Sequence, residues 1–407
     1  MAAHAADCDV AVVGLGPAGL AAALALAEAG LTVTVVGPAP TAEALAKETR
    51  TTALFGGSVE LLRHLGAWPA LADAAAALTG LRLIDDTGRL LRAPETLFRA
   101  SEIGREAFGY NIETAKLTTA LHALAAASPG IRIIAEAVIQ VAPGNDVVRL
   151  AGAGGTVVSA RLVVGADGRA SRCRDAAGVA TETWSYPQTA IATRFQHSRP
   201  HEGISTELHR RAGPLTTVPM PGSWSSLVWV ETPDEARRLA AVADDAFAGA
   251  LETRLGGLLG TVSQVGARAC FPLSGLTAKP LAQNRIALIG EAGHVLPPIG
   301  AQGLNLGLRD AAWITECAAI AKADGRDVGG DAVLQAFRQA RAGDVASRTL
   351  AVDLLNRSLL ADVMPLDLLR GAGLVALGAL PWLRRAVMQA GLGPGGPLPR
   401  LLRPATA

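Results

Sequence analysis

The feature that most constrains this chain is a glycine-rich turn between a short apolar run and an alanine-rich segment. Residues 9–13 read DVAVV, residues 14–19 read GLGPAG, and an Ala/Leu-rich run extends to about residue 28. A Val/Thr run follows at residues 31–36. A buried strand, a tight turn, a helix and a second strand in this order predict a parallel β-α-β unit with a right-handed crossover.

Each residue of this turn has a physical task. Gly14 permits the tight turn, Gly16 lets the backbone approach a pyrophosphate, and Gly19 lets the helix pack on the strand. The helix start at Pro17 and Ala18 offers free N–H groups and the positive end of the helix dipole to the phosphates. A lone GxGxxG is weak evidence, but its place between a strand and a helix strengthens it. The pattern predicts a dinucleotide site.

One element of this pattern is missing. The second strand of such a unit usually ends in an acidic residue that binds the ribose, but Gly37 stands at this position. The nearest acid is Glu43. The sequence leaves open whether Glu43 reaches the ribose or whether backbone groups and other side chains replace the acid.

Charge and cysteine content exclude several classes of function. Lys and Arg number 37 against 36 Asp and Glu, so no global positive field favours nucleic acid. The four cysteines are scattered and have no His at zinc-ligand spacing, which argues against a disulfide framework or a zinc site and for a reducing cytosol. The N-terminus lacks the basic start of a signal peptide. We therefore expect a cytoplasmic enzyme with no metal site and no nucleic-acid partner.

Two further glycine-rich segments follow strand-like runs. Residues 163–171 read VVGADGRAS, and residues 288–310 read LIGEAGHVLPPIGAQGLNLGLRD, with a helix expected at about 301–321. Taken alone, the Asp-Gly pair of the first segment is most often an ordinary turn. His294 in the second segment is more often a structural or capping residue than a catalytic base, and we favour that reading. The order and spacing of the segments carry more weight than either one.

Together the three segments resemble the fingerprints of the FAD-dependent aromatic hydroxylases that are similar to para-hydroxybenzoate hydroxylase. Within that class A flavin monooxygenase group, the chain most closely resembles the ubiquinone-biosynthesis hydroxylases. Supporting strings are RTTAL at 50–54, LGAW at 65–68, YPQ at 186–188, LVW at 227–229 and FPL at 271–273. The resemblance implies an α/β fold: a Rossmann-type FAD-binding domain with an inserted β-sheet substrate domain and a C-terminal helical segment.

The same reading predicts where the domains begin and end. The expected parts are the first part of the FAD-binding domain at 1–180, the substrate domain at 181–272, the second part of the FAD-binding domain at 273–330, and C-terminal helices with a loose tail at 331–407. A small hairpin region is expected at about 80–110, inside the first part. Residues 47–68 read as a loop that enters a helix, and residues 234–255 as one helix.

The resemblance also implies which residues bind the ligands. The predicted cofactor-binding residues are Gly14, Gly16, Pro17, Ala18, Gly19, Arg50, Asp167, Gly168, Gly290, Glu291, Pro298, Gly300, Gln302, Gly303, Leu304 and Asn305. The predicted substrate-pocket residues are Gly213, Pro214, Trp229 and Pro297. Glu291 stands where the family usually has Asp, which bonds a ribityl hydroxyl. The helix that starts at 300–305 would direct its positive end at the flavin pyrimidine.

The implied function is that of a monooxygenase. NAD(P)H would reduce FAD, O2 would form a flavin C4a-hydroperoxide, and its distal oxygen would transfer to a phenolic, polyprenylated ring in ubiquinone biosynthesis. The chemistry belongs to the cofactor, so no catalytic side chain is predicted. Two alternatives stay open: an FAD-dependent reductase or dehydrogenase of a prenylated substrate, and a non-catalytic flavoprotein partner in a biosynthetic complex. The sequence does not separate NADH from NADPH.

The C-terminal residues 370–407 contain five arginines, at 370, 384, 385, 400 and 403, and no acid. Leucines and valines interleave with the first three. A basic amphipathic helix of this kind either lies on an anionic membrane surface or packs on its own domain with solvated arginines. The sequence is therefore compatible with a peripheral position on the inner membrane face, and with a homo-oligomer or a biosynthetic complex.

Overall fold

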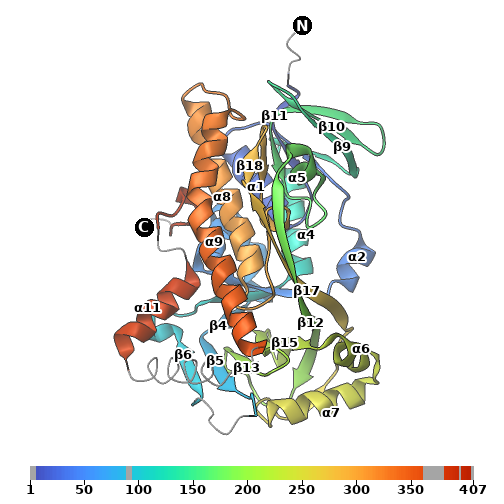
Figure 1. Ribbon diagram of the computed structural model, residues 1–407, viewed down its shortest axis with the longest axis vertical. Coiled ribbons are helices and arrows are strands. Elements are labelled where there is room, and N and C mark those ends of the chain that lie inside the picture. The colour runs from blue at the N-terminus through green and yellow to red at the C-terminus, as the bar shows by residue number, and fades with distance from the viewer. Residues whose placement is uncertain (1–5, 89–93, 361–379, 394–395, 405–407) are drawn as a thin grey trace.

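The computed structural model describes residues 6–88, 94–360, 380–393 and 396–404. Three sheets organise these residues. One carries the N-terminal β-α-β unit, one is built mainly from the middle of the chain, and a small one consists of β3, β7 and β4. In Figure 1 the first sheet and its helices form the upper part of the molecule, and the middle sheet lies below them.

The first sheet confirms the predicted β-α-β unit. Strands β1 (Cys8–Val13) and β2 (Val33–Val36) pair in parallel and flank the turn into α1 (Pro17–Glu28). The sheet order is β18-β19-β11-β1-β2-β8, with β18 (Ala282–Gln283), β19 (Ile286–Leu288), β11 (Val157–Gly165) and β8 (Ile131–Ile134). An antiparallel hairpin of β9 (Val138–Pro143) and β10 (Val148–Gly152) extends from β11. All three glycine-rich segments therefore follow parallel strands that are neighbours in this sheet.

Helices cover this sheet, which explains why its strands are apolar on both faces. Helix α1 packs against α4 (Thr114–Ala127) and α8 (Gln302–Ala323), and α8 packs against α9 (Asp331–Leu360). The helix expected at about 301–321 is thus confirmed as α8. Its buried residues and those of α1 share one core with the parallel strands.

The middle sheet is antiparallel over most of its width. Its strands are β20 (His294–Val295), β17 (Ala269–Lys279), β12 (Ala180–His197), β15 (Trp224–Glu231), β14 (Leu215–Met220), β13 (Ile204–His209), β5 (Gly80–Asp85) and β6 (Thr96–Arg99), in that order. A two-residue strand, β16 (Val262–Ser263), pairs with β12. Helices α6 (Pro233–Ala241) and α7 (Asp244–Leu255) cover one face.

Strand pairing crosses the predicted domain limits. The hairpin region at 80–110 supplies β5 and β6, and β5 pairs in parallel with β13, so these strands extend the middle sheet. The hairpin itself lies inside the expected region, where β5 pairs with β6 at 96–99. Strands β12 and β17 pair side by side within the middle sheet (Figure 1), and β17, at 269–279, continues past the limit expected at 272. The limits at 180, 272 and 330 stay a prediction.

Three local predictions were wrong. Residues 47–68 contain a strand, β3 (Thr51–Phe55), before α3 (Gly56–His64), because β3 pairs with β7 (Gly109–Glu113). Residues 234–255 form two helices, since Val242 is extended and the acids at 244 and 245 favour a new helix start. The tail is not loose throughout: Leu401 and Leu402 are buried in a 3-10 turn, Arg400–Leu402, that packs against α3 and α8.

The C-terminal helices are confirmed in part. Helix α9 and helix α11 (Pro381–Leu392) lie within the predicted helical stretch. Residues 361–379, and with them Arg370, lie outside the described residues. In the part of the chain that is described, no helix is long and apolar enough to cross a membrane.

Candidate active site

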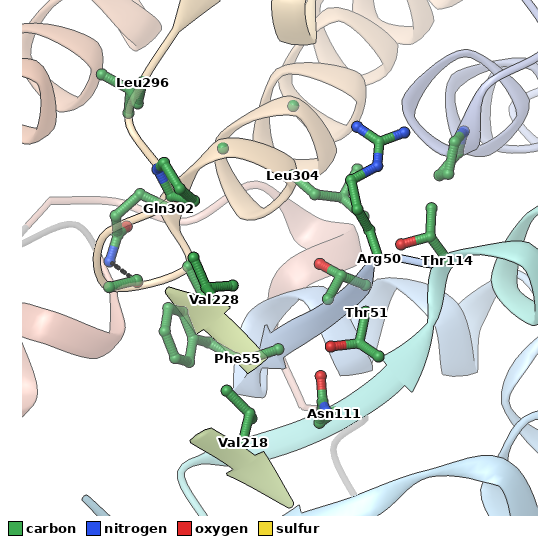
Figure 2. A pocket seen from close by; sticks show the side chains of 18 of the residues that line it. Arg50, Thr51, Phe55, Asn111, Thr114, Val218, Val228, Leu296, Gln302 and Leu304 are labelled. Carbon is green, nitrogen blue, oxygen red and sulfur yellow. Dashed lines mark hydrogen bonds between the residues drawn. The ribbon is translucent and has the colours of Figure 1, made fainter. Parts of the chain in front are cut away.

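A cavity of about 650 Å³ lies at the carboxyl ends of the parallel strands and reaches the middle sheet. Ligands of open α/β sheets bind at this edge. Side chains from β3, β7, β14, β15 and α8 surround this space in Figure 2, among them Thr51, Asn111, Val218, Val228 and Gln302. Thirteen of the predicted cofactor residues line the cavity: Gly16, Pro17, Ala18, Gly19, Arg50, Gly168, Gly290, Glu291, Pro298, Gly300, Gln302, Gly303 and Leu304.

The turn before α1 leaves room for a phosphate group. Gly14 has φ +117°, and a Cβ on Gly14 would overlap the carbonyl of Ala166, so only glycine fits. A Cβ on Gly16 would meet no other described atom within 4 Å, and its backbone faces the cavity. Among the described residues, no side chain caps α1 and no acid stands in its first turn. The first amides of α1 are thus free to bind an anion.

The missing ribose acid has no direct substitute at position 37. A Cβ on Gly37 would lie 2.8 Å from Leu15 Cδ1 and 3.3 Å from Gly14 Cα, so a larger side chain would crowd the turn. Glu43 lies on the exposed helix α2 (Ala42–Lys47), pairs with Lys47 at 2.6 Å, and is not among the residues that line the cavity. Any ribose contact on this side must therefore come from other groups.

Asp167 stabilises the second motif from outside the cavity. Its Oδ1 accepts a hydrogen bond from Ser171 Oγ at 2.6 Å, and its Oδ2 accepts one from the amide of Cys173 at 3.1 Å. These bonds fix the start of α5 (Arg172–Ala177). Gly168, the next residue, lines the cavity with φ +76°. The structure thus places Gly168 at the cavity and the Asp167 carboxylate behind it.

A buried charge cluster holds the third motif in place. Asp310 on α8 accepts hydrogen bonds from the Gly290 amide at 3.0 Å, His294 Nε2 at 2.6 Å and Arg341 Nε at 2.7 Å. Arg341 on α9 also donates to Asp344 at 2.7 Å. Burial alone would raise the pKa of Asp310, but His294 and Arg341 hold that pKa well below its usual range. His294 is fully buried in this cluster, as the structural reading predicted.

Helix α8 begins at the cavity with an unusual backbone. Gly300 has φ +63° and Ala301 has φ +50°, so two consecutive residues are left-handed before Gln302. No side chain caps α8 in the described structure, and Gln302 Oε1 is buried without a described partner. Asn305 does not line the cavity; its side chain binds the backbone of Ala53, Phe55 and Ala301. Asn305 therefore fixes the helix start against β3.

Arg50 and Glu291 are charged residues that line the cavity near the glycine-rich turns. Arg50 donates to both oxygens of Glu48, at 2.9 and 2.6 Å, and its guanidinium lies 5.6 Å from the ring centre of Phe271. The hydrogen bond to Glu48 raises the pKa of Arg50, and the charge of Glu291 adds to this. The cavity thus offers hydrogen-bond donors from the uncapped starts of α1 and α8 and from the half-exposed Arg50, and its glycine turns leave room for a ligand. This arrangement fits the diphosphate and isoalloxazine of FAD.

The middle sheet closes the other end of the cavity with alternate residues of three strands. Ser205 and Glu207 of β13, Thr216 and Val218 of β14, and Ser226 and Val228 of β15 line it. Successive side chains of a strand point to opposite faces, so their neighbours face α6 and α7. The apolar walls are completed by Leu78, Leu81, Phe108, Leu296, Met388 and Leu392.

The predicted substrate pocket is only partly reproduced. Pro297 lines the cavity, but Trp229 is 2% exposed and packs in the core with Phe247 on the opposite face of the sheet. Gly213 and Pro214 lie outside the lining residues. The sequence reading missed Glu207 and Thr216. Successive residues of a strand face opposite sides of the sheet. If Leu208, Leu215 and Leu227 are assigned to the core, Glu207 and Thr216, their neighbours in sequence, are expected on the opposite face.

The described residues contain no cluster of three or more His, Cys, Asp or Glu side chains that could hold a metal ion. The four cysteines are free thiols.

Comparison with known proteins points the same way. The FAD-binding-domain family model matches residues 7–342. The chain is 34% identical to ubiquinone hydroxylase UbiL of Rhodospirillum rubrum, over 97% of this chain and 92% of that protein. It is 30% identical to 3-demethoxyubiquinol 3-hydroxylase of Escherichia coli, over 95% and 98%. The fold resembles that of p-nitrophenol 4-monooxygenase PnpA of Pseudomonas putida, with a TM-score of 0.75, 19% identity and coverage of 94% and 96%.

Proposed function

The chain belongs to the FAD-binding-domain family of FAD-dependent aromatic hydroxylases, and we propose that it hydroxylates a polyprenylated phenol in ubiquinone biosynthesis. The observation that carries the proposal is one continuous cavity that joins the predicted FAD-binding loops to a partly polar face of the middle sheet. A flavin at one end would meet a ring held at the other. The balanced reaction is ArH + O2 + NAD(P)H + H⁺ → ArOH + NAD(P)⁺ + H2O.

The residues of the cavity support this chemistry in distinct ways. When bound, FAD supplies the electron transfer and the activation of oxygen. The free amides of α1 would hold its diphosphate, and the positive end of α8 would favour negative charge on the ring system placed there. Apolar walls such as Phe108, Val218 and Val228 exclude water, which would otherwise divert activated oxygen to hydrogen peroxide.

Oxygen labelling tests this function and separates it from a reductase or dehydrogenase. Purified, FAD-loaded protein would be given NADH or NADPH, a phenol with a short prenyl tail, and labelled O2. We expect one labelled oxygen atom in the product and one nicotinamide consumed for each. Nicotinamide consumption that depends on the substrate but leaves no label in it would contradict the proposal, and protein that takes up no FAD would favour a non-catalytic partner.

Helix α11 supports contact with a membrane surface, from which a prenylated substrate would enter. Met388 and Leu392 line the cavity, and Met388 packs on Phe98 and Phe108. The outer side of the helix exposes Trp382, which is 68% exposed, and Val387. The inner side thus packs on the protein and the outer side is free to enter a bilayer interface.

Not all of the basic residues are available for lipid. Arg384 binds both carboxylate oxygens of Glu102 and lies over the Phe98 ring, whereas Arg385 is exposed. Membrane contact would therefore depend more on the apolar side chains than on net charge. We infer that the protein binds the inner membrane face peripherally; membership of a complex or a homo-oligomer stays a prediction.

Vesicle flotation tests the membrane contact. The double variant Trp382→Ala, Val387→Ala should float less than the wild type with vesicles of mixed neutral and anionic lipid. A matched control is Leu350→Ala, Leu354→Ala, which removes two exposed leucines of α9 instead. Equal flotation of the α11 variant and the wild type would rule out this helix as the contact.

A further inference from the structure

A buried acid faces the substrate end of the cavity, and the function proposed above does not yet use it. Glu207 lies in the middle of β13, is 7% exposed and lines the cavity. Of the charged side chains that line the described cavity, Arg50 and Glu291 belong to the cofactor end, which leaves Glu207 as the charged group of the sheet end. Among the described residues, Glu207 forms an ion pair with His209 and with no Lys or Arg. A buried carboxylate without such a partner is costly, so its place here needs a reason.

One oxygen of this carboxylate is held by a histidine two residues along the strand. His209 Nε2 lies 2.7 Å from Glu207 Oε1, and His209 is itself buried. Thr216 Oγ1 lies 3.5 Å from Glu207 Oε2, at the outer limit of a hydrogen bond. Oε1 therefore has a strong partner, whereas Oε2 has at most a weak one and can accept a further donor.

The neighbouring groups of the sheet face are already engaged with one another. Thr51 donates to Ser226 Oγ at 2.8 Å, and Asn111 donates to the Pro219 carbonyl at 2.9 Å. Ser205 donates to the Thr217 carbonyl at 3.1 Å. These bonds engage the donors of Thr51, Asn111 and Ser205, so Glu207 Oε2 has no strong donor among the described residues and is open to a donor on a ligand. Asn111 Oδ1 is a second buried acceptor of this lining without a described partner.

Aromatic hydroxylation gives such an acceptor a task. The ring attacks electrophilic oxygen more readily when its hydroxyl has lost a proton, because the phenolate pushes charge into the ring. A free phenol ionises only near pH 10, as tyrosine does. A carboxylate in hydrogen-bond reach of the hydroxyl favours proton loss in the transition state at neutral pH.

We propose that Glu207 is the hydrogen-bond acceptor and general base for the phenolic hydroxyl of the substrate, and that His209 is its positioning residue. The O–H bond of the phenol breaks, its proton passes to Glu207 Oε2, and the electron pair stays on the phenolate oxygen. The same carboxylate selects substrates with a free hydroxyl over their O-methylated analogues. This inference rests on the proposed function, since it assigns a role within that reaction.

The test compares Glu207→Gln with the wild type on two phenols of different acidity. One is a phenol with a short prenyl tail, and the other is its ring-fluorinated analogue, whose hydroxyl ionises at lower pH. Labelled oxygen in the product and hydrogen peroxide released are measured across the pH range. Glu207→Gln keeps the size of the side chain but cannot take the proton, so hydroxylation should fall by about 100-fold at neutral pH. The loss should shrink to less than about 10-fold for the fluorinated phenol and as pH approaches 10.

A matched control separates this role from stability. Glu231 is a second buried acid of the same sheet, but it faces the core, where it binds Arg210 at 2.5 Å and Trp229 at 3.1 Å. Glu231→Gln should lower the melting temperature and leave the pH profile of hydroxylation unchanged. His209→Gln should give a smaller loss than Glu207→Gln, with the same rescue by the more acidic phenol.

The outcomes distinguish the two proposals. If the wild type incorporates no labelled oxygen, the proposed function fails and this inference falls with it. If the wild type hydroxylates and Glu207→Gln does so equally well, only the inference is overturned. It is also overturned if Glu207→Gln loses the same factor with both phenols at every pH, because a merely structural acid would behave in that way.

Discussion

The two ends of the cavity are built by different rules. At the cofactor end, backbone groups line the space, and glycines stand where a Cβ would collide or where a ligand must approach. At the sheet end, side chains of β13, β14 and β15 line it, and each strand has a buried residue on both faces. A backbone conformation that only glycine can adopt is visible in the sequence, whereas the face of the sheet to which a strand residue points is not. The cofactor end could therefore be predicted from the glycine spacing, and the sheet end could not.

The largest effect on stability is expected at Trp229, which the sequence placed in the substrate pocket and the structure places in the core. Trp229→Ala should lower the free energy of unfolding by about 3–5 kcal/mol, because it empties a core position beside Phe247 and leaves Glu231 without one donor. Val228→Ala, one residue away on the cavity face, should alter substrate KM with a smaller loss of stability. Chemical denaturation and steady-state kinetics measure both. A Trp229→Ala protein of normal stability with a raised KM would return this tryptophan to the substrate pocket.

A slightly smaller effect is expected behind the cofactor loop. Asp310→Asn removes the charge that faces Arg341 and replaces one of the two acceptor oxygens by an NH2 donor, so one of the groups that donate to Asp310 loses its acceptor. The unfolding free energy should therefore fall by about 3 kcal/mol. FAD should also be lost more readily, because the Gly290 turn lines its site. Denaturation and the absorbance of retained flavin check this. Normal flavin retention by a destabilised variant would show that the cluster supports the fold alone.

The pH dependence of this cluster follows from the lowered pKa of Asp310. A carboxyl group whose pKa is depressed in the folded state stabilises the fold above its unfolded pKa, near 3.8, and loses that contribution as pH falls through the folded value. The stability that Asp310 provides should therefore be complete at pH 5 and above. The difference between wild type and Asp310→Asn should shrink only below about pH 4; a difference that already disappears at pH 6 would contradict this assignment.

What the sequence could predict follows the same division. The β-α-β unit, the strand–turn segment at 163–171 and helix α8 were predictable because glycines and apolar runs mark each boundary. Strand β3 was not, since Leu54, Leu61 and Leu62 fit one helical stripe although Leu54 pairs in a sheet with β7. The prediction of a loose tail was wrong because its Pro and Gly content favours an irregular chain, whereas Leu401 and Leu402 are buried against α3 and α8, which lie far away in sequence. Long-range pairing, and not local propensity, decided these cases.

A substitution at Gly16 tests the difference between the two ends of the cavity, because it should lower FAD affinity without lowering the stability of the protein. Gly16→Asp places a good capping residue at the N-cap of α1, in open space, so the protein without FAD should keep or slightly gain stability. The same carboxylate would repel the diphosphate, and FAD affinity should fall by about 100-fold, or about 2.7 kcal/mol. Flavin titration measures the affinity. Gly249→Asp, also in open space but on α7, is the control and should leave it unchanged.

The smallest effect is expected at Ala301, which among the described residues that line the cavity is the one non-glycine residue with a positive φ. Ala301 has φ +50° at the start of α8, a conformation that costs an L-residue about 1 kcal/mol relative to glycine. Ala301→Gly should therefore raise the unfolding free energy by up to about 1 kcal/mol, with part of the gain offset by the greater freedom of the unfolded chain. The reciprocal change at the preceding residue, Gly300→Ala at φ +63°, should lower it by about the same amount. Thermal and chemical denaturation of the two variants give the comparison. Should Ala301→Gly destabilise the protein, the methyl group of Ala301 must contribute packing that outweighs the strain, and this position would favour alanine despite its positive φ.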